Sequence, residues 1–182
     1  MKRLIMMAFV MILLFGGIAE ARTVHQMLNR QNRPNAAYDM SVIPDLLKSN
    51  ANVFFVDNEA TYASDQVGNH GDRPEFPFKT YDYAIGQCTA GENNIIVLLP
   101  YSQENVTADS VDVDVTGITT IGLGYGPARP KFISTATGSS FNVGSTGDGA
   151  TFMNITFEAG ISAVAVGIEI EDLANNITFI DC

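Results

Sequence analysis

Hydrophobic residues in this chain occur in short runs that turn-forming residues separate. Two apolar runs span 53–56 and 95–100, and the second has no polar alternation, which predicts a strand buried on both faces. From Val106 onward the runs are rich in β-branched residues and are broken by Gly, Asp and Asn, as is typical of short, frequent strands. These later predicted strands span 111–115, 118–121, 131–135, 141–143, 151–157, 164–170 and 177–180.

One segment has the periodicity of a helix. Tyr81, Ala84, Ile85 and Cys88 recur at helical spacing, which predicts a helix over 81–88 with these residues as its buried stripe. Thr80 stands at the position of an N-cap. The preceding residues, 57–77, are rich in Gly, Asn, Asp and Pro and predict a long loop.

An internal repeat favours a solenoid over a sandwich or a barrel. The tetrapeptide Asn-Ile-Thr-Phe at 154–157 recurs at 176–179, an interval of 22 residues. This interval suits one coil of a β-solenoid and is too short for a propeller blade of about 40 residues. Ile133 and Val111 stand at the same spacing before Ile155, which predicts one ladder of inward side chains. Residues 118–120 also resemble the repeat but lie off this spacing, so either an insertion near 145–149 interrupts the coils or the earlier coils are irregular.

The order of these features resembles a known superfamily. Residues 77–80 read Pro-Phe-Lys-Thr, the helix and the strand 95–100 follow, and then come Tyr101, the segment Glu104-Asn105-Val106 and the segment 118–124. This order is similar to the pectin-methylesterase-type opening of the pectate-lyase-like superfamily, over roughly residues 53–182. The flanking segments 54–57 and 129–130 also resemble β-helix proteins of tailed-phage virions. The resemblance implies an all-β fold, a right-handed single-stranded parallel β-helix with an N-terminal helix that caps the first coil.

The N-terminus has the pattern of a secretion signal. Lys2 and Arg3 precede an apolar run over 4–19, which is shorter than the roughly 20 residues of a membrane span, and Ala19-Glu20-Ala21 fits a signal-peptidase site. We therefore expect a signal peptide at 1–21, a linker or attachment segment at 22–50 with a short helix around 43–48, and the β-helix at 51–182. An uncleaved membrane anchor is the alternative. We expect the protein to be secreted or extracellular, including a place on a cell surface or a virion, and to have no membrane span after cleavage. We also expect the β-helix to be incomplete at its C-terminal end.

The net charge limits the classes of ligand that this protein can bind. A net charge of −10 argues against nucleic acid, whose binding depends on Lys and Arg, and against an anionic polysaccharide unless a cation bridges the two.

Cys88 and Cys182 fall on coils that several steps of about 4.8 Å would separate. We expect both to be free, buried thiols.

Two acidic groups are the candidate ligand sites. Asp112 and Asp114 alternate with apolar residues and so share one strand face, and Glu169 and Glu171 share another. Paired carboxylates bind Ca²⁺ or act as acid and base in glycoside cleavage, although a solvated face is the favoured interpretation of both pairs. The sequence predicts no other cofactor.

Other polar motifs have simpler explanations. His70 lies in a polar loop where an ordinary turn is favoured over a ligand or a general base, and His25 lies in the linker. The Asn-x-Thr motifs at 105, 154 and 176 match glycosylation sequons, but two of them coincide with the repeat, which favours Asn side chains stacked at a turn. No Lys or Arg follows Lys131, so these coils supply no basic catalytic residue, and we identify no catalytic residues.

Three functions remain open from the sequence. The leading hypothesis is an exported or virion-associated module, non-catalytic in these residues, whose surface binds a glycan or a surface protein. The alternative is the N-terminal part of a polysaccharide lyase, esterase or hydrolase with its catalytic coils further along. The third is a structural spike element that forms a homotrimer. Glycan binding without turnover would favour the first.

Overall fold

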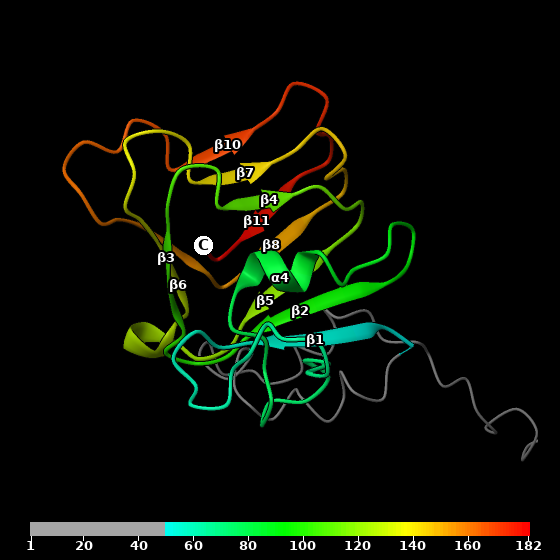
Figure 1. The fold of residues 1–182 in the computed structure, drawn as a ribbon. Coiled ribbons are helices and arrows are strands. Elements are labelled where there is room, and N and C mark those ends of the chain that lie inside the picture. Colours follow the sequence, from blue (N-terminus) through cyan, green and yellow to red (C-terminus); the bar gives the residue numbers. More distant parts are fainter. Residues whose placement is uncertain (1–49) are drawn as a thin grey trace, which may run out of the picture.

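The computed structural model describes residues 50–182, which form a parallel β-solenoid of about three turns (Figure 1). The predicted signal peptide and nearly all of the predicted linker lie outside the described residues. The strands are short because turn residues interrupt each apolar run. In chain order they are β1 (Asn52–Val56), β2 (Asn94–Leu98), β3 (Gln103–Val106), β4 (Val111–Val113), β5 (Thr119–Gly122), β6 (Lys131–Ser134), β7 (Phe141–Val143), β8 (Thr151–Met153), β9 (Thr156–Ala159), β10 (Ile168–Ile170) and β11 (Thr178–Ile180).

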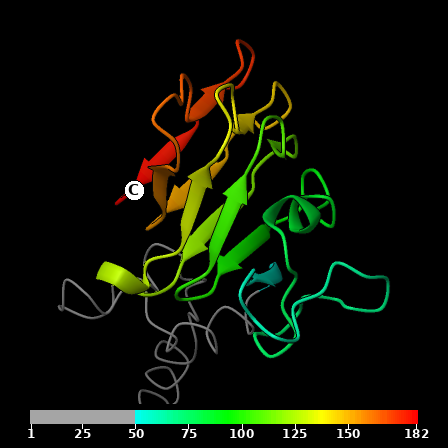
Figure 2. The same ribbon diagram turned by 60° about the vertical axis from the view of Figure 1, so that its left-hand side comes forward.

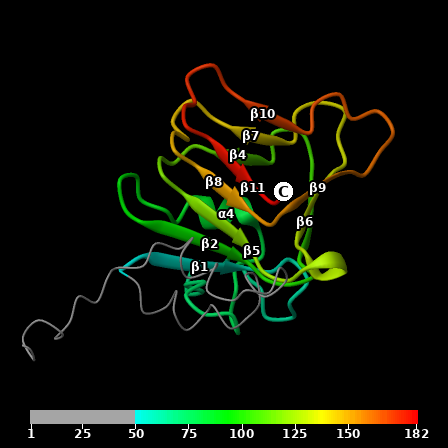
Figure 3. The ribbon, with the colours of Figure 1, turned by 180° about the vertical axis from the view of Figure 1, so that it is seen from behind.

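The strands form three parallel sheets that surround one core. The largest has the order β1-β2-β5-β8-β11, and Figure 3 shows its strands rising one above another. The other two have the orders β3-β6-β9 and β4-β7-β10, and the stacking of β3 and β6 can be followed in Figure 2. The prediction of an all-β parallel β-helix is therefore confirmed at the level of the parallel solenoid.

The 22-residue repeat does not correspond to a coil, which corrects the predicted ladder. Ile95 pairs with Thr119, Thr119 with Thr151, and Thr151 with Thr178, so successive coils contain 24, 32 and 27 residues. The coils differ because their connections differ: residues 123–130 join β5 to β6, whereas only two residues join β8 to β9. Val111 and Ile133 consequently lie in different sheets.

The two repeated asparagines stand at different corners, so the predicted stack of Asn side chains is wrong. Asn154 lies between β8 and β9, and Asn176 lies just before β11. Both adopt a positive φ, 55° and 58°, which Asn tolerates better than most residues. The resemblance between the tetrapeptides thus reflects a shared left-handed turn.

The predicted helix is present as α4 (Tyr81–Ile85) and lies against β4 and β1 at the start of the solenoid (Figure 1). The Thr80 side chain accepts a hydrogen bond from the backbone N–H of Tyr83, as expected of an N-cap. The helix ends at Ile85, earlier than predicted, because the N–H of Cys88 bonds to the Ile85 carbonyl three residues back and tightens the last turn. α4 occupies the place that a strand below β4 would take.

Aromatic rings fill the interior from the capping helix upward. Phe141 is completely buried and its ring contacts those of Tyr81, Phe132, Phe152 and Phe157, at centroid distances from 5.0 to 5.8 Å. Such pairs add to the stability that burial of their apolar area provides. These contacts join all three sheets and the helix into one core.

Both cysteines are free, as predicted, but neither is fully buried. Cys88 is half-buried and Cys182 is exposed. Partial burial still raises the pKa of the Cys88 thiol to about 12 and shifts the pKa of Cys182 in the same direction. A high pKa keeps a thiol protonated and poorly nucleophilic, so Cys88 has the character of a packing residue.

Candidate ligand-binding site

The long loop between β1 and α4 is held in shape by its own polar side chains. The Asn69 amide nitrogen donates hydrogen bonds to the backbone carbonyls of Ser64 at 2.6 Å and Pro77 at 2.9 Å. Its amide oxygen accepts a hydrogen bond from the backbone N–H of Gly71. These bonds close the loop on itself and fix the positions of the side chains along it.

Asp65 attaches the same loop to the capping helix. Its carboxylate accepts hydrogen bonds from the backbone N–H groups of Lys79 at 2.7 Å and Thr80 at 3.2 Å. It also accepts one from the Thr80 hydroxyl at 2.8 Å. The loop therefore has the fixed backbone that a binding site needs.

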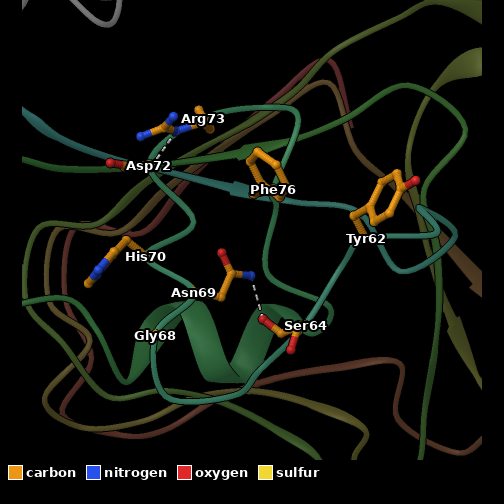
Figure 4. Close-up of a pocket in the computed structure, with 8 residues that line it drawn as sticks. All are labelled: Tyr62, Ser64, Gly68, Asn69, His70, Asp72, Arg73 and Phe76. Atoms are coloured by element: carbon orange, nitrogen blue, oxygen red, sulfur yellow. Dashed lines mark hydrogen bonds and ion pairs between the residues drawn. The ribbon is translucent and has the colours of Figure 1, made fainter.

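A hollow of about 380 Å³ opens within this loop (Figure 4). The rings of Tyr62 and Phe76 form one part of it, with centroids 6.3 Å apart and planes tilted by 57°. Their residues are 71% and 50% exposed, so both rings present apolar surface to solvent. The lining is completed by polar residues and one glycine, namely Ser64, Gly68, Asn69, His70, Asp72 and Arg73.

The charged groups of the hollow are neutralised locally. The Arg73 side chain donates to the Asp72 carboxylate at 3.1 Å, and both side chains are more than half exposed. His70 also lies on the lining and has no hydrogen-bond partner among residues 50–182, so its ring nitrogens face solvent. The hollow thus combines two aromatic surfaces with hydrogen-bonding groups of both kinds and little net charge.

Sequence reasoning missed the two aromatic residues of this hollow. The polar residues around His70 predict an ordinary turn, whereas the structure places His70 on the lining of the hollow beside Asp72 and Arg73. A signal was present, because Tyr62 and Phe76 are aromatic residues inside a segment of turn formers. That the loop brings the two rings together could be learned only from its fold.

The predicted acidic residues lie on another part of the surface, where the structure brings two of them together. The Asn142 amide nitrogen, on β7, donates to Asp112 on β4 at 3.3 Å and to Glu171 after β10 at 3.1 Å. Burial, followed by the nearby charges of Asp114 and Glu171, raises the pKa of Asp112. The bonds from Asn142 and from the backbone N–H of Ser145 lower the pKa of Glu171.

The remaining predicted residues surround this pair without completing a ligand set. Asp114 affects Asp112 only through its charge, and Glu169 lies with Glu171 along a shallow hollow of about 580 Å³. Within residues 50–182, no three His, Cys, Asp or Glu side chains are grouped so that they could hold a metal ion. The geometry gives the Ca²⁺ interpretation no support, and the four carboxylates stay predictions.

Comparisons of the chain with protein-family models, with curated proteins and with solved structures find no match in any of the three. No helix in the described part of the chain is long and apolar enough to cross a membrane.

Proposed function

We propose that this protein is an exported, non-catalytic β-solenoid that binds a neutral glycan in the hollow formed by Tyr62 and Phe76. The observation that carries the proposal is the pair of exposed rings over a hollow of about 380 Å³ in a loop with a fixed backbone. The export is inferred from the signal-like pattern of residues 1–21.

The chemistry of the lining fits a sugar. Pyranose rings have apolar C–H faces, which pack against aromatic rings, and hydroxyl groups at their edges, which need hydrogen-bond partners when they leave water. Tyr62 and Phe76 supply the apolar surface, and the side chains of His70, Asp72 and Arg73 can donate and accept at the edges.

The charge distribution favours a neutral glycan over a polyanion. Arg73 is already paired with Asp72, so it offers no unbalanced positive charge to a uronic acid or a sulfate. The chain as a whole carries a net charge of −10, which repels polyanions at long range.

The solenoid fold agrees with a relationship to the pectate-lyase-like superfamily, which we propose from the motifs at 77–124. That relationship does not imply catalysis, because one scaffold carries many functions. The alternative, a polysaccharide-active enzyme, differs from our proposal in one measurable respect, since the enzyme would release new reducing ends from its ligand.

Binding to neutral oligosaccharides, first on a glycan array and then by titration calorimetry, tests the proposal. We expect Tyr62→Ala and Phe76→Ala each to weaken binding about five- to thirtyfold, because each removes an aromatic contact worth roughly 1–2 kcal/mol. Tyr125→Ala is the matched control, since Tyr125 is 58% exposed but lies outside the hollow, and its affinity should equal that of the wild type.

Two results would contradict the proposal. One is the absence of any neutral-glycan binding by the wild-type protein, and the other is equal binding by the Tyr62 and Phe76 variants with unchanged circular dichroism. Release of reducing ends by the wild type would favour the enzyme instead.

A further inference from the structure

The five-stranded sheet has a second hydrophobic cluster on its outer face, separate from the core inside the solenoid. Side chains alternate along a strand, so those that do not point inward must point out. Eight apolar residues point outward from this sheet and its extensions, and none of the eight is more than 9% exposed, whereas the outward threonines of β5, β8 and β11 are more exposed. The eight are Val53, Phe55, Ile95, Val97, Leu99, Ile121, Leu123 and Met153, and we call them the outer cluster.

This face differs from the outer faces of the other two sheets. On β3 the outward residues are Gln103 and Asn105, and on β4 and β7 they are Asp112 and Asn142. Such polar residues are what a solenoid presents to water. An outer face of Val, Ile, Leu and Phe is instead a surface that something must cover.

No other part of residues 50–182 contributes an apolar side chain to the outer cluster. Its partly buried neighbours are Ala51, directly before β1, and Ile180 on the sheet's own last strand. Yet Phe55, Ile95 and Val97 are 0% exposed. The cover therefore has to come from outside the described residues.

We propose that residues 36–49 of the same chain are this cover. The segment leads directly into β1, so its C-terminal end is already positioned at the edge of the face, where Ala51 packs on the cluster. Pro44 suits the first turn of the short helix predicted around 43–48, in which Ile43, Leu46 and Leu47 recur at positions i, i+3 and i+4. This spacing puts the three apolar residues on one side of the helix, with Asp45 and Lys48 on the other.

The length of the segment fits the width of the face. The outer cluster extends from β1 to β8 across three strand spacings, or about 14 Å. The 14 residues of 36–49 would span at least about 21 Å at the 1.5 Å per residue of a helix, and more wherever they are extended, which is enough to cross those strands. Residues 36–49 would then be part of the domain instead of a linker.

Photo-crosslinking in the full chain tests this proposal without disturbing the fold. A diazirine amino acid replaces Leu47, and as a control it replaces Gln31. We expect activation at position 47 to give an intramolecular crosslink to a peptide that contains 95–99 or 119–123, at a yield several times that from position 31. Crosslinks between two chains would show that a second copy covers the face, and equal yields at 47 and 31 would show that the segment does not, so either result overturns the proposal.

A pair of substitutions provides an independent measurement. Leu46→Asp combined with Leu47→Asp should lower the melting temperature by at least about 5 °C and increase the binding of a hydrophobic dye, because the outer cluster loses its cover. Ser41→Asp combined with Ser49→Asp adds the same charge to polar positions of the segment and should change neither quantity. Equal melting temperatures and dye binding for the two pairs would contradict the proposal.

Discussion

The carboxylate of Glu104 accepts a hydrogen bond of 2.9 Å from the backbone N–H of Tyr81, and this bond joins the capping helix to the first coil. Glu104 points inward from β3, in register with Phe132 on β6, and is only 8% exposed. Ionisation of a carboxyl group in this position is unfavourable, because the buried charge lacks the water that would solvate it at the surface.

Burial raises the pKa of Glu104 from its ordinary 4.5 to about 7, against the effect of the Tyr81 N–H, which lowers it. Between these two pH values the folded protein holds a proton that the unfolded chain has released. The free energy of unfolding should therefore fall as the pH rises from about 4.5 to 7, by on the order of 3 kcal/mol, and stay low above pH 7. Urea denaturation across this range would measure the decrease.

Glu104→Gln removes the titration while keeping an oxygen that can accept from Tyr81. We expect this variant to lose most of the decrease between pH 4.5 and 7. Glu75→Gln, at an exposed carboxyl, should keep it. A Glu104→Gln variant with the wild-type pH dependence would show that another group is responsible.

Asn154 holds a corner of the solenoid through its side chain. Its buried amide nitrogen donates two hydrogen bonds of 2.8 Å, to the carbonyls of Gly122 and Gly124 in the coil below. Asn154→Ala should lower the free energy of unfolding by about 3–4 kcal/mol, because it leaves two buried carbonyls unpaired and places Ala at a φ of 55°. Chemical denaturation would give the value.

Asn176→Ala separates the two contributions to this loss. Asn176 has nearly the same φ, 58°, but is exposed and makes no comparable bonds within the described residues. Its substitution should cost only the backbone strain, about 1 kcal/mol. Equal losses for the two variants would mean that the amide bonds of Asn154 contribute nothing.

The sequence predicts a strand of this fold well where the polarity of each residue matches the side to which its side chain points, into the core or out of it. The strand at 95–100 was predicted as buried on both faces, and all five residues of β2 are buried, because every residue there is apolar or paired. β3 was missed, because the buried Glu104 stands where an apolar residue would have completed the alternation. The run 151–157 was predicted as one strand, since no pattern of apolar residues marks the left-handed turn at Asn154 that divides it.

The binding hollow was less predictable than the fold. Its shape depends on side-chain hydrogen bonds such as those that the Asp65 carboxylate accepts from Thr80, across 15 positions of the chain. Such bonds cannot be predicted from residue types alone. The regular spacing of the acidic residues made those candidates visible in the sequence, whereas the two aromatic rings are brought together only by the folded loop.

Asp65 should matter both to stability and to ligand binding. Asp65→Ala removes the acceptor of three hydrogen bonds that attach the loop to α4. Because the site is partly exposed, we expect a loss of about 1–2 kcal/mol in the free energy of unfolding, together with weaker glycan binding from a loop that is no longer fixed. Glu59→Ala, at an exposed acid of the same loop, should change neither quantity. Unchanged stability of Asp65→Ala would mean that other contacts fix the loop.

Phe141 and Phe179 test how stability is distributed along the solenoid. Phe141 is 0% exposed and contacts four aromatic rings, whereas Phe179 is 37% exposed and contacts those of Phe152 and Phe157. Phe141→Ala should cost about 4 kcal/mol, because it leaves a cavity between three sheets and the capping helix. Phe179→Ala should cost about 1–2 kcal/mol, since its ring is already partly in water. Urea denaturation of both variants measures the difference, and equal losses would mean that the last coil supports the fold as much as the centre does.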